Sequence, residues 1–191
     1  MSDDILDPIE PNWTGAYESA RQGHSPRLEF DWYAIDATGH IAMFSTAGFG
    51  PVPTQVFEDR EAFGLVHRHF CNAQATTEAR LVRKMPPPPE RPAASTFWEW
   101  LFAQLGFYNE PRPPKPCWDD WLAVAARGLF AYDYELQNGV TACYKLVAVP
   151  QSPICIETTP EAVRLWLGGM RFPGQFADLP ILDSRQTFAC V

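Results

Sequence analysis

Residues 28–46 read LEFDWYAIDATGHIAMFST and contain the first clear secondary-structure signal of the chain. Aromatic and β-branched residues alternate with acidic ones over residues 28–36, a pattern that is typical of a half-buried strand. Ala37-Thr38-Gly39 follows as a turn in which Gly39 provides a positive φ. Residues 40–46 then return as a second apolar strand. The sequence therefore predicts a β-hairpin over residues 28–46.

A second hairpin is predicted further along the chain. Residues 129–135 and 140–149 are two strand-like runs, and Gln137-Asn138-Gly139 separates them. Asn-Gly between two such runs is among the strongest short-range hairpin signals. Apolar spacing and helix start and stop residues predict helices over about residues 57–73, 96–106, 118–127 and 160–168.

The predicted fold class is α+β. An antiparallel sheet built from the two β-hairpins is expected to pack against about four short helices. Trp32 and Phe130 are expected to be buried in this sheet. Apolar residues make up 46% of the sequence, which is enough for a sizeable core.

The domain organisation follows from length and from the prolines. The chain has 191 residues, about the usual size of one domain, so residues 1–191 are expected to form a single α+β domain. Residues 1–27 are expected to be an irregular N-terminal arm, anchored by Trp13 and Tyr17. Residues 86–92 are expected to be a Pro-rich loop, with a linker between two domains as the alternative. The tail over residues 172–188 is expected to be extended and irregular.

Charge limits the classes of partner. The formal net charge is −8, and residues 1–31 hold seven acidic residues against two arginines. A negative field repels phosphate backbones and anionic lipid surfaces, so neither a nucleic-acid nor a membrane partner is expected. It favours basic protein partners, although plain solubility is the ordinary interpretation of an acidic protein.

The compartment is expected to be the cytoplasm. The N-terminus has no basic region followed by an apolar one, so it does not resemble a secretory signal. No apolar stretch approaches the 18 or more residues that span a bilayer. The five cysteines are widely spread, without a Cys-x-x-Cys pair, and are interpreted as reduced thiols.

One group of residues has the composition of a metal site. His67, His69 and Cys71 would converge on one side of a strand as a soft metal triad. The surrounding pattern is helical, however, and a helix places His69 about 200° away from each of the other two. His67 and Cys71 would still meet at i, i+4. We therefore expect no metal and assign these residues to a solvated helix face with one buried Cys.

The segment Gly48-Phe49-Gly50 resembles a fragment of a phosphate-binding loop. It is followed by Pro51 and Pro53, which remove N–H donors and block the helix start that phosphate binding requires. No cofactor is therefore expected here. The segment is interpreted as a turn whose Phe49 is presented at the loop tip, where an exposed aromatic residue anchors a partner.

No catalytic residue is expected. The sequence has no Gly-x-Ser-x-Gly elbow and no cysteine in a recognisable catalytic context. A catalytic Cys–His pair is still compatible with the sequence. Several carboxylates would be able to form an acid/base pair across strands, but their spacing is not diagnostic of any reaction. These carboxylates are Asp31, Asp36, Asp119, Asp120, Asp133 and Glu135.

Aromatic residues are unusually frequent, with seven Trp and thirteen Phe. They cluster over residues 97–102 and 118–122, close to the proline-rich stretches. Stacking of Trp on Pro is the ordinary interpretation. Acidic residues interleaved with Trp are also typical of an interface with a basic partner. From these features we expect a partner-binding surface made of Trp118, Asp119, Asp120 and Glu135, with Phe49 as an outlying anchor.

Several blocks of the sequence carry a resemblance. The hairpin over residues 31–44, the loop over 48–53, the segment over 127–133 and the tail over 172–188 resemble a family of uncharacterised bacterial proteins. That family resembles immunity proteins found beside polymorphic or contact-dependent toxins. The resemblance implies a cytosolic immunity protein that binds and neutralises a cognate toxin domain, and it carries over no catalytic residue. The alternatives are a small carboxylate- or Cys/His-dependent enzyme and a non-catalytic adaptor module.

Overall fold

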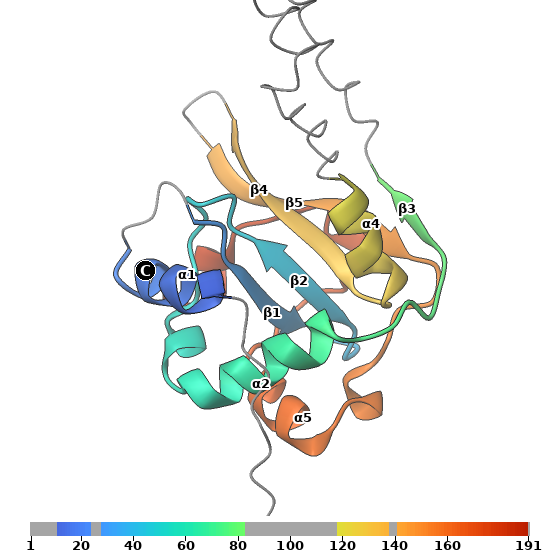
Figure 1. The fold of residues 1–191 in the computed structure, drawn as a ribbon. Coiled ribbons are helices and arrows are strands. Elements are labelled where there is room, and N and C mark those ends of the chain that lie inside the picture. The colour runs from blue at the N-terminus through green and yellow to red at the C-terminus, as the bar shows by residue number, and fades with distance from the viewer. Residues whose placement is uncertain (1–10, 24–27, 83–117, 138–140, 191) are drawn as a thin grey trace, which may run out of the picture.

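The computed structural model describes residues 11–23, 28–82, 118–137 and 141–190. Within these residues the chain forms a six-stranded sheet of order β1-β2-β4-β5-β3, with β6 paired to β5 (Figure 1). The strands are β1 (Asp31–Ile35), β2 (Ile41–Ser45), β3 (Ala79–Leu81), β4 (Phe130–Gln137), β5 (Thr141–Pro150) and β6 (Ile181–Leu182). The α-helices are α1 (Pro11–Arg21), α2 (Arg60–Cys71), α4 (Trp118–Ala126) and α5 (Glu161–Gly168). Short 3-10 helices cover Thr54–Phe57, Ile156–Thr158, Phe176–Asp178 and Ser184–Gln186.

The α+β class is confirmed, and both predicted hairpins belong to one sheet. β1 pairs with β2, and β4 with β5, in antiparallel register. Contrary to the expectation of a purely antiparallel sheet, the two hairpins join through β2 and β4, which run parallel. Parallel neighbours need a long crossover connection. Here that connection is the whole of residues 46–129, which includes α2 and α4.

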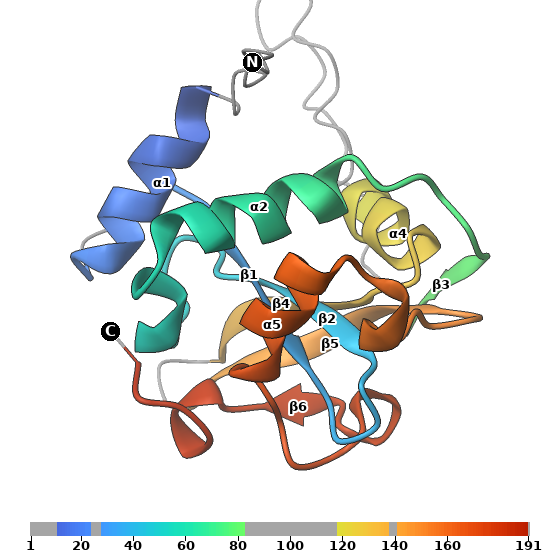
Figure 2. The same cartoon turned by 90° about the horizontal axis from the view of Figure 1, so that it is seen from below.

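The sheet is covered on both faces. α2 and α4 lie over one face, and α5 packs beside α2, whereas β6 and the chain that leads to the C-terminus run along the opposite face (Figure 2). Among the described residues, no helix combines the length and the apolar character that crossing a membrane requires.

The face opposite α2 and α4 carries a stack of aromatic rings. Trp32 lies on Phe44 with 4.2 Å between ring centroids, and Phe44 lies on Tyr132 at 4.8 Å. These three residues occupy aligned positions on β1, β2 and β4. Phe172 and Phe176, from the tail that was expected to be irregular, pack onto the stack and are almost fully buried. Trp32 and Phe130 are buried as predicted.

The N-terminal arm differs from its prediction. Residues 11–21 form α1, although their sequence was expected to be irregular. Trp13 and Tyr17 are buried, as the prediction required. Trp13 stacks on Phe63 of α2, and the guanidinium of Arg60 lies 5.8 Å from the Trp13 ring centroid. A helix this short gains its stability from packing rather than from propensity, which is why the local sequence did not reveal it.

α2, α4 and α5 agree with the predicted helices to within a few residues, whereas β3 and β6 were not predicted. α2 begins after Asp59, whose side chain accepts a hydrogen bond from the Ala62 N–H at 2.9 Å. This cap ends the preceding 3-10 turn and starts the helix three residues later than expected. The predicted helix over residues 96–106, the Pro-rich loop over 86–92 and the turn at Asn138-Gly139 lie outside the described residues.

Candidate functional site

A row of polar side chains crosses the sheet at one level. Asp31 of β1 is aligned with Ser45 of β2, Ser45 with Asp133 of β4, and Asp133 with Lys145 of β5. Side chains alternate between the two faces of a strand. Because Trp32, the neighbour of Asp31, faces the aromatic stack, the polar row faces the side that α2 and α4 cover.

Two further carboxylates flank the row. The Ser45 hydroxyl donates to Glu29 Oε1 at 2.6 Å. Lys145, which is 4% exposed, donates its ammonium to Glu135 at the other end of the row. The buried ammonium group of Lys145 is thus paired with Glu135. Over the described ranges, no ion pair joins Glu29, Asp31 or Asp133 to a cation.

A cavity of about 420 Å³ opens beside this row. The sheet contributes Glu29, Asp31 and Ser45 to its wall, and α4 contributes Asp120, which is exposed. We call the four carboxylates Glu29, Asp31, Asp120 and Asp133 the acidic face. The rest of the cavity wall includes Tyr33, Met43, Phe70, Cys71, Trp121, Val124, Arg127 and Leu129.

The cavity therefore combines negative charge with an apolar wall. Arg127 is a cation on its rim, and the Nε–H of Arg127 donates to the carbonyl oxygen of Ala73 at 3.1 Å. A second cavity of about 350 Å³ shares Glu29 and Asp31 with the first and is also lined by Trp13 and His67. Asp31 thus lies between two hollows.

The environment of the acidic face disfavours the ionised forms of two of its carboxyl groups. Burial, followed by the charge of Glu29, raises the pKa of Asp31 to about 7. The same two causes raise the pKa of Asp133 to about 7. Carboxyl groups with pKa values this far above normal are more frequent at functional sites than elsewhere. The acidic face is therefore the strongest candidate site in the part of the chain that the structure describes.

His67, His69 and Cys71 do not converge on one point, as predicted, but Cys71 is exposed, whereas the helix face was expected to hold one buried Cys. His67 Nε2 lies 3.4 Å from Cys71 Sγ, whereas His69 lines a different surface hollow beside Leu65. His67 Nδ1 is 3.3 Å from the Tyr33 hydroxyl. Burial lowers the pKa of His67 to about 4, so this imidazole is neutral. No cluster of three His, Cys, Asp or Glu side chains with a metal-binding arrangement occurs among the described residues.

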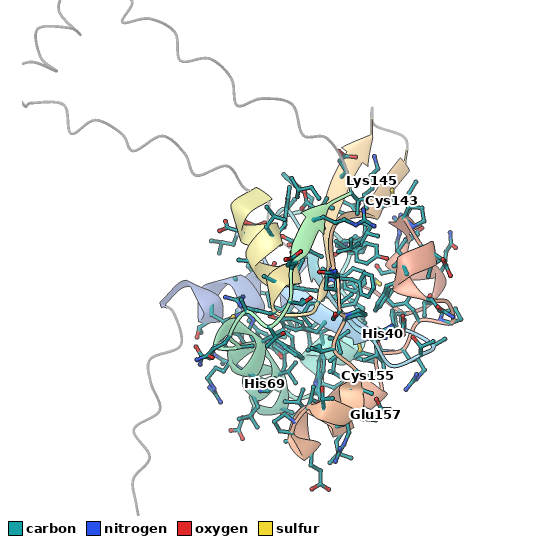
Figure 3. All side chains as sticks on the ribbon, turned by 90° about the vertical axis from the view of Figure 1, so that its right-hand side faces the viewer. His40, His69, Cys143, Lys145, Cys155 and Glu157 are labelled. Atoms are coloured by element: carbon teal, nitrogen blue, oxygen red, sulfur yellow. The ribbon has the colours of Figure 1, made fainter. Side chains whose placement is uncertain are left out.

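The other polar cluster of the fold has a structural role. It lies at the opposite end of the sheet and includes His40, Cys155 and Glu157, whereas Lys145 lies at the end with the polar row (Figure 3). The buried Asp36 carboxylate accepts hydrogen bonds from the N–H groups of His40 and Phe176, at 2.9 and 3.0 Å. These bonds fix the first hairpin turn to the C-terminal segment. Asp36, a candidate carboxylate in the sequence, is thus used to hold the fold.

The expected partner-binding residues are only partly brought together. Asp120 lines the cavity, and Glu135 borders the polar row on the same face of β4 as Asp133. Phe49 is 56% exposed in the loop after β2, as expected for a loop-tip residue. Trp118 and Asp119 begin α4, but their side chains lie outside the description.

The prediction of the partner surface omitted Glu29, Asp31 and Asp133. The hairpin register already implies that Asp31 lies opposite Ser45, because their positions are equidistant from the Thr38 turn. Asp133 joins them only through the parallel pairing of β2 and β4, which no local pattern reveals. No family model, curated protein or solved structure matches this chain.

Proposed function

We propose that this protein is a cytoplasmic immunity protein and that it neutralises a toxin domain by binding a basic surface of that domain to the acidic face. The observation that carries the proposal is the grouping of Glu29, Asp31 and Asp120 around a cavity, with Asp133 aligned beside Ser45 of its wall. Among the described residues, none of these four carboxylates forms an ion pair. The resemblance of several sequence blocks to an uncharacterised bacterial family, which is itself similar to immunity proteins, supports the same interpretation.

The energetics favour a cationic partner. Like charges held together in a half-buried position destabilise the free protein, and a cationic side chain that enters the cavity relieves this repulsion. The gain appears only in the complex, so it contributes to affinity. The net charge of −8 adds long-range steering of a basic partner. The apolar wall beside Trp121 supplies area that an aliphatic Lys or Arg stem covers.

Binding to the toxin domain encoded beside this protein tests the proposal. The variant Asp31→Asn/Asp133→Asn is compared with Glu161→Gln/Asp178→Asn, which removes the same charge from exposed positions elsewhere. Loss of charge pairs at an interface costs several-fold to a thousandfold in affinity. We expect at least a tenfold weaker affinity for the first variant and less than a threefold change for the second. No binding at micromolar protein, with no rescue of cells that express the toxin, would refute the proposal.

A carboxylate-dependent enzyme is the second candidate. It is favoured by one observation, an Asp31 with a pKa of about 7 beside Glu29 in a cavity large enough for a small ligand. The two candidates differ in stoichiometry. A binding protein inhibits the toxin only up to one equivalent, whereas an enzyme that reverses or prevents the damage protects at far lower amounts. Titrating toxin activity with this protein separates them.

A further inference from the structure

A series of contacts leads from a buried tyrosine to an exposed cysteine beside the cavity. The Tyr33 hydroxyl lies 3.3 Å from His67 Nδ1, and His67 Nε2 lies 3.4 Å from Cys71 Sγ. Tyr33 is 1% exposed, whereas Cys71 is an exposed thiol, and both line the cavity of about 420 Å³. His67 and Cys71 are four residues apart on α2, so their side chains lie on the same side of the helix. The imidazole is thus held between a hydroxyl and a thiol.

The buried hydroxyl determines which imidazole nitrogen carries the hydrogen. A buried hydroxyl donates its hydrogen to a partner, and within the described residues the Tyr33 hydroxyl meets His67 Nδ1. Nδ1 is therefore the acceptor. Because burial keeps the imidazole neutral, with a pKa of about 4, its single hydrogen lies on Nε2 and is directed at Cys71 Sγ. The rings of Trp13 and Phe63 stack on the imidazole and hold its orientation.

The surroundings of Cys71 act on its thiolate in opposite directions. A thiol attacks as its thiolate, and the N–H of His67 stabilises that ion as a hydrogen-bond donor. Cys71 ends α2, however, where the helix dipole is negative. In the described part of the cavity wall, three carboxylates face one guanidinium. These side chains are Glu29, Asp31, Asp120 and Arg127. The thiolate is therefore favoured most when a ligand brings a positive charge into the cavity.

We propose that Cys71 is a covalent modification site for small disulfides that carry an ammonium group, with His67 as donor to the attacking sulfur and Tyr33 as the residue that fixes the His67 tautomer. The Cys71 thiolate attacks one sulfur of the disulfide. A bond from Cys71 Sγ to that sulfur forms, the original S–S bond breaks, and the departing thiolate takes up the proton that Cys71 released. The ammonium group of the adduct lies beside the carboxylates of the cavity wall. This site is independent of the proposed function.

Nitrogen NMR of the histidine rings in the full chain tests the contacts of the imidazole. At neutral pH, His67 is expected to carry its hydrogen on Nε2 and none on Nδ1. Tyr33→Phe keeps the ring but removes the hydroxyl, so both tautomers of His67 are expected in this variant. His69, which lines a different hollow, is the internal control and should not change. A hydrogen on Nδ1 of His67 in the wild type would overturn the roles of Tyr33 and His67.

The ligand class is tested with three disulfides of different charge. Cystamine is cationic, hydroxyethyl disulfide is neutral and dithiodipropionate is anionic. Because the chain has five cysteines, the adduct on Cys71 is followed by peptide mass spectrometry. Each rate is divided by the rate of the same disulfide with N-acetylcysteine amide, which removes differences in intrinsic reactivity. At low salt, this relative rate is expected to be about tenfold higher for cystamine than for hydroxyethyl disulfide and lowest for dithiodipropionate. Equal relative rates for the three would overturn the ligand class.

Variants of the two histidines of α2 test the donor. His67→Ala is expected to slow the reaction of Cys71 with cystamine about tenfold, because a hydrogen bond to an ion is lost. His67→Gln keeps a side-chain N–H and should retain part of the rate. His69→Ala is the matched control and should react as the wild type does. A wild-type rate for His67→Ala would overturn the role of His67. The tautomer and the charge preference are measured on the wild type, so the proposal can fail even if His67→Ala does not fold.

Discussion

At the scale of the residue, Asp31 and Asp133 differ from side chains that only stabilise the fold. A position between strands that is aligned with Ser45 and covered by helices would ordinarily hold apolar or small side chains. Both carboxyl groups instead have pKa values of about 7, because burial and the charge of Glu29 disfavour their ionised forms. Buried carboxyl groups that reduce stability and have no cationic partner within the described residues are expected at sites where binding or catalysis uses them.

The stability lost by burying these carboxyl groups is measurable, because it makes the free energy of unfolding depend on pH. The pKa of Asp31 rises from 3.8 in the unfolded chain to about 7 in the folded protein, so the folded state binds more protons between these values. Stability is therefore lowest above about pH 7 and increases as the pH falls through the folded pKa. We expect Asp31→Asn to raise the free energy of unfolding at pH 8 by about 2 kcal/mol and to flatten its pH dependence. Denaturant unfolding at pH 5.5 and 8 measures this. The exposed-site variant Asp178→Asn should keep the wild-type slope, and an equal slope for Asp31→Asn would contradict the assignment.

At the scale of the element, contacts with other elements decide what the local sequence leaves open. The loop after β2 contains two glycines with different roles. Gly48 has a φ of +76°, a conformation that other residues adopt at a cost. Gly50 lies against the rings of Tyr134 and Tyr144, where a Cβ would come within 2.9 Å and 2.6 Å of their atoms. The loop is thus shaped by packing, and Phe49 between these glycines is left exposed.

Gly50 gives the first prediction at this scale. Gly50→Ala places a methyl group against Tyr144, whose hydroxyl donates to the Pro51 carbonyl at 3.0 Å. We expect a loss of about 1–3 kcal/mol in the free energy of unfolding. Gly168→Ala is the matched control, because no atom lies within 4 Å of its added Cβ and it ends a helix. It should be neutral or stabilising by up to about 1 kcal/mol. Equal effects of the two changes in denaturant unfolding would rule out the packing role of Gly50.

The second prediction at this scale concerns the packing of α1 against the rest of the protein. Trp13 is 7% exposed and stacks on Phe63, so Trp13→Ala is expected to cost about 3–5 kcal/mol. Hydrogen exchange over residues 11–21 should increase in this variant. Trp13→Phe keeps a ring at this position, and the indole N–H that it removes has no hydrogen-bond partner in the described structure. It should therefore cost much less. If both variants exchanged as slowly as the wild type, α1 would not depend on Trp13.

At the scale of the whole molecule, the sequence predicts what is local and misses what is distant. Alternation and turn residues predicted both hairpins, and the resulting register is enough to pair Asp31 with Ser45. The parallel pairing of β2 with β4 brings together residues more than 80 positions apart. It depends on how the crossover packs, and no turn or spacing encodes it. The grouping of Asp133 with Asp31 was missed for that reason, although both residues had been named as candidate carboxylates.

The same distinction between local and distant features applies to the core. The rings of Phe172 and Phe176 come from a tail with no periodic pattern, so no local signal indicated that they lie in the core. They cover the aromatic face of the sheet, which leaves the opposite face, with its carboxylates, for α2 and α4. One face of the sheet thus carries the aromatic stack of the core, and the other face carries the proposed binding site.

This division predicts that the position of a charge, and not only the total, controls association with the toxin domain. Asp120→Lys, at the cavity, and Asp178→Lys, in the segment on the opposite face, each change the net charge from −8 to −6 because a −1 group becomes +1. We expect Asp120→Lys to slow association at least tenfold at low salt and to flatten its salt dependence. Asp178→Lys should slow it less than threefold and keep most of that dependence. Stopped-flow association at two salt concentrations distinguishes the cases, and equal slowing by both variants would mean that overall charge, rather than the acidic face, directs the encounter.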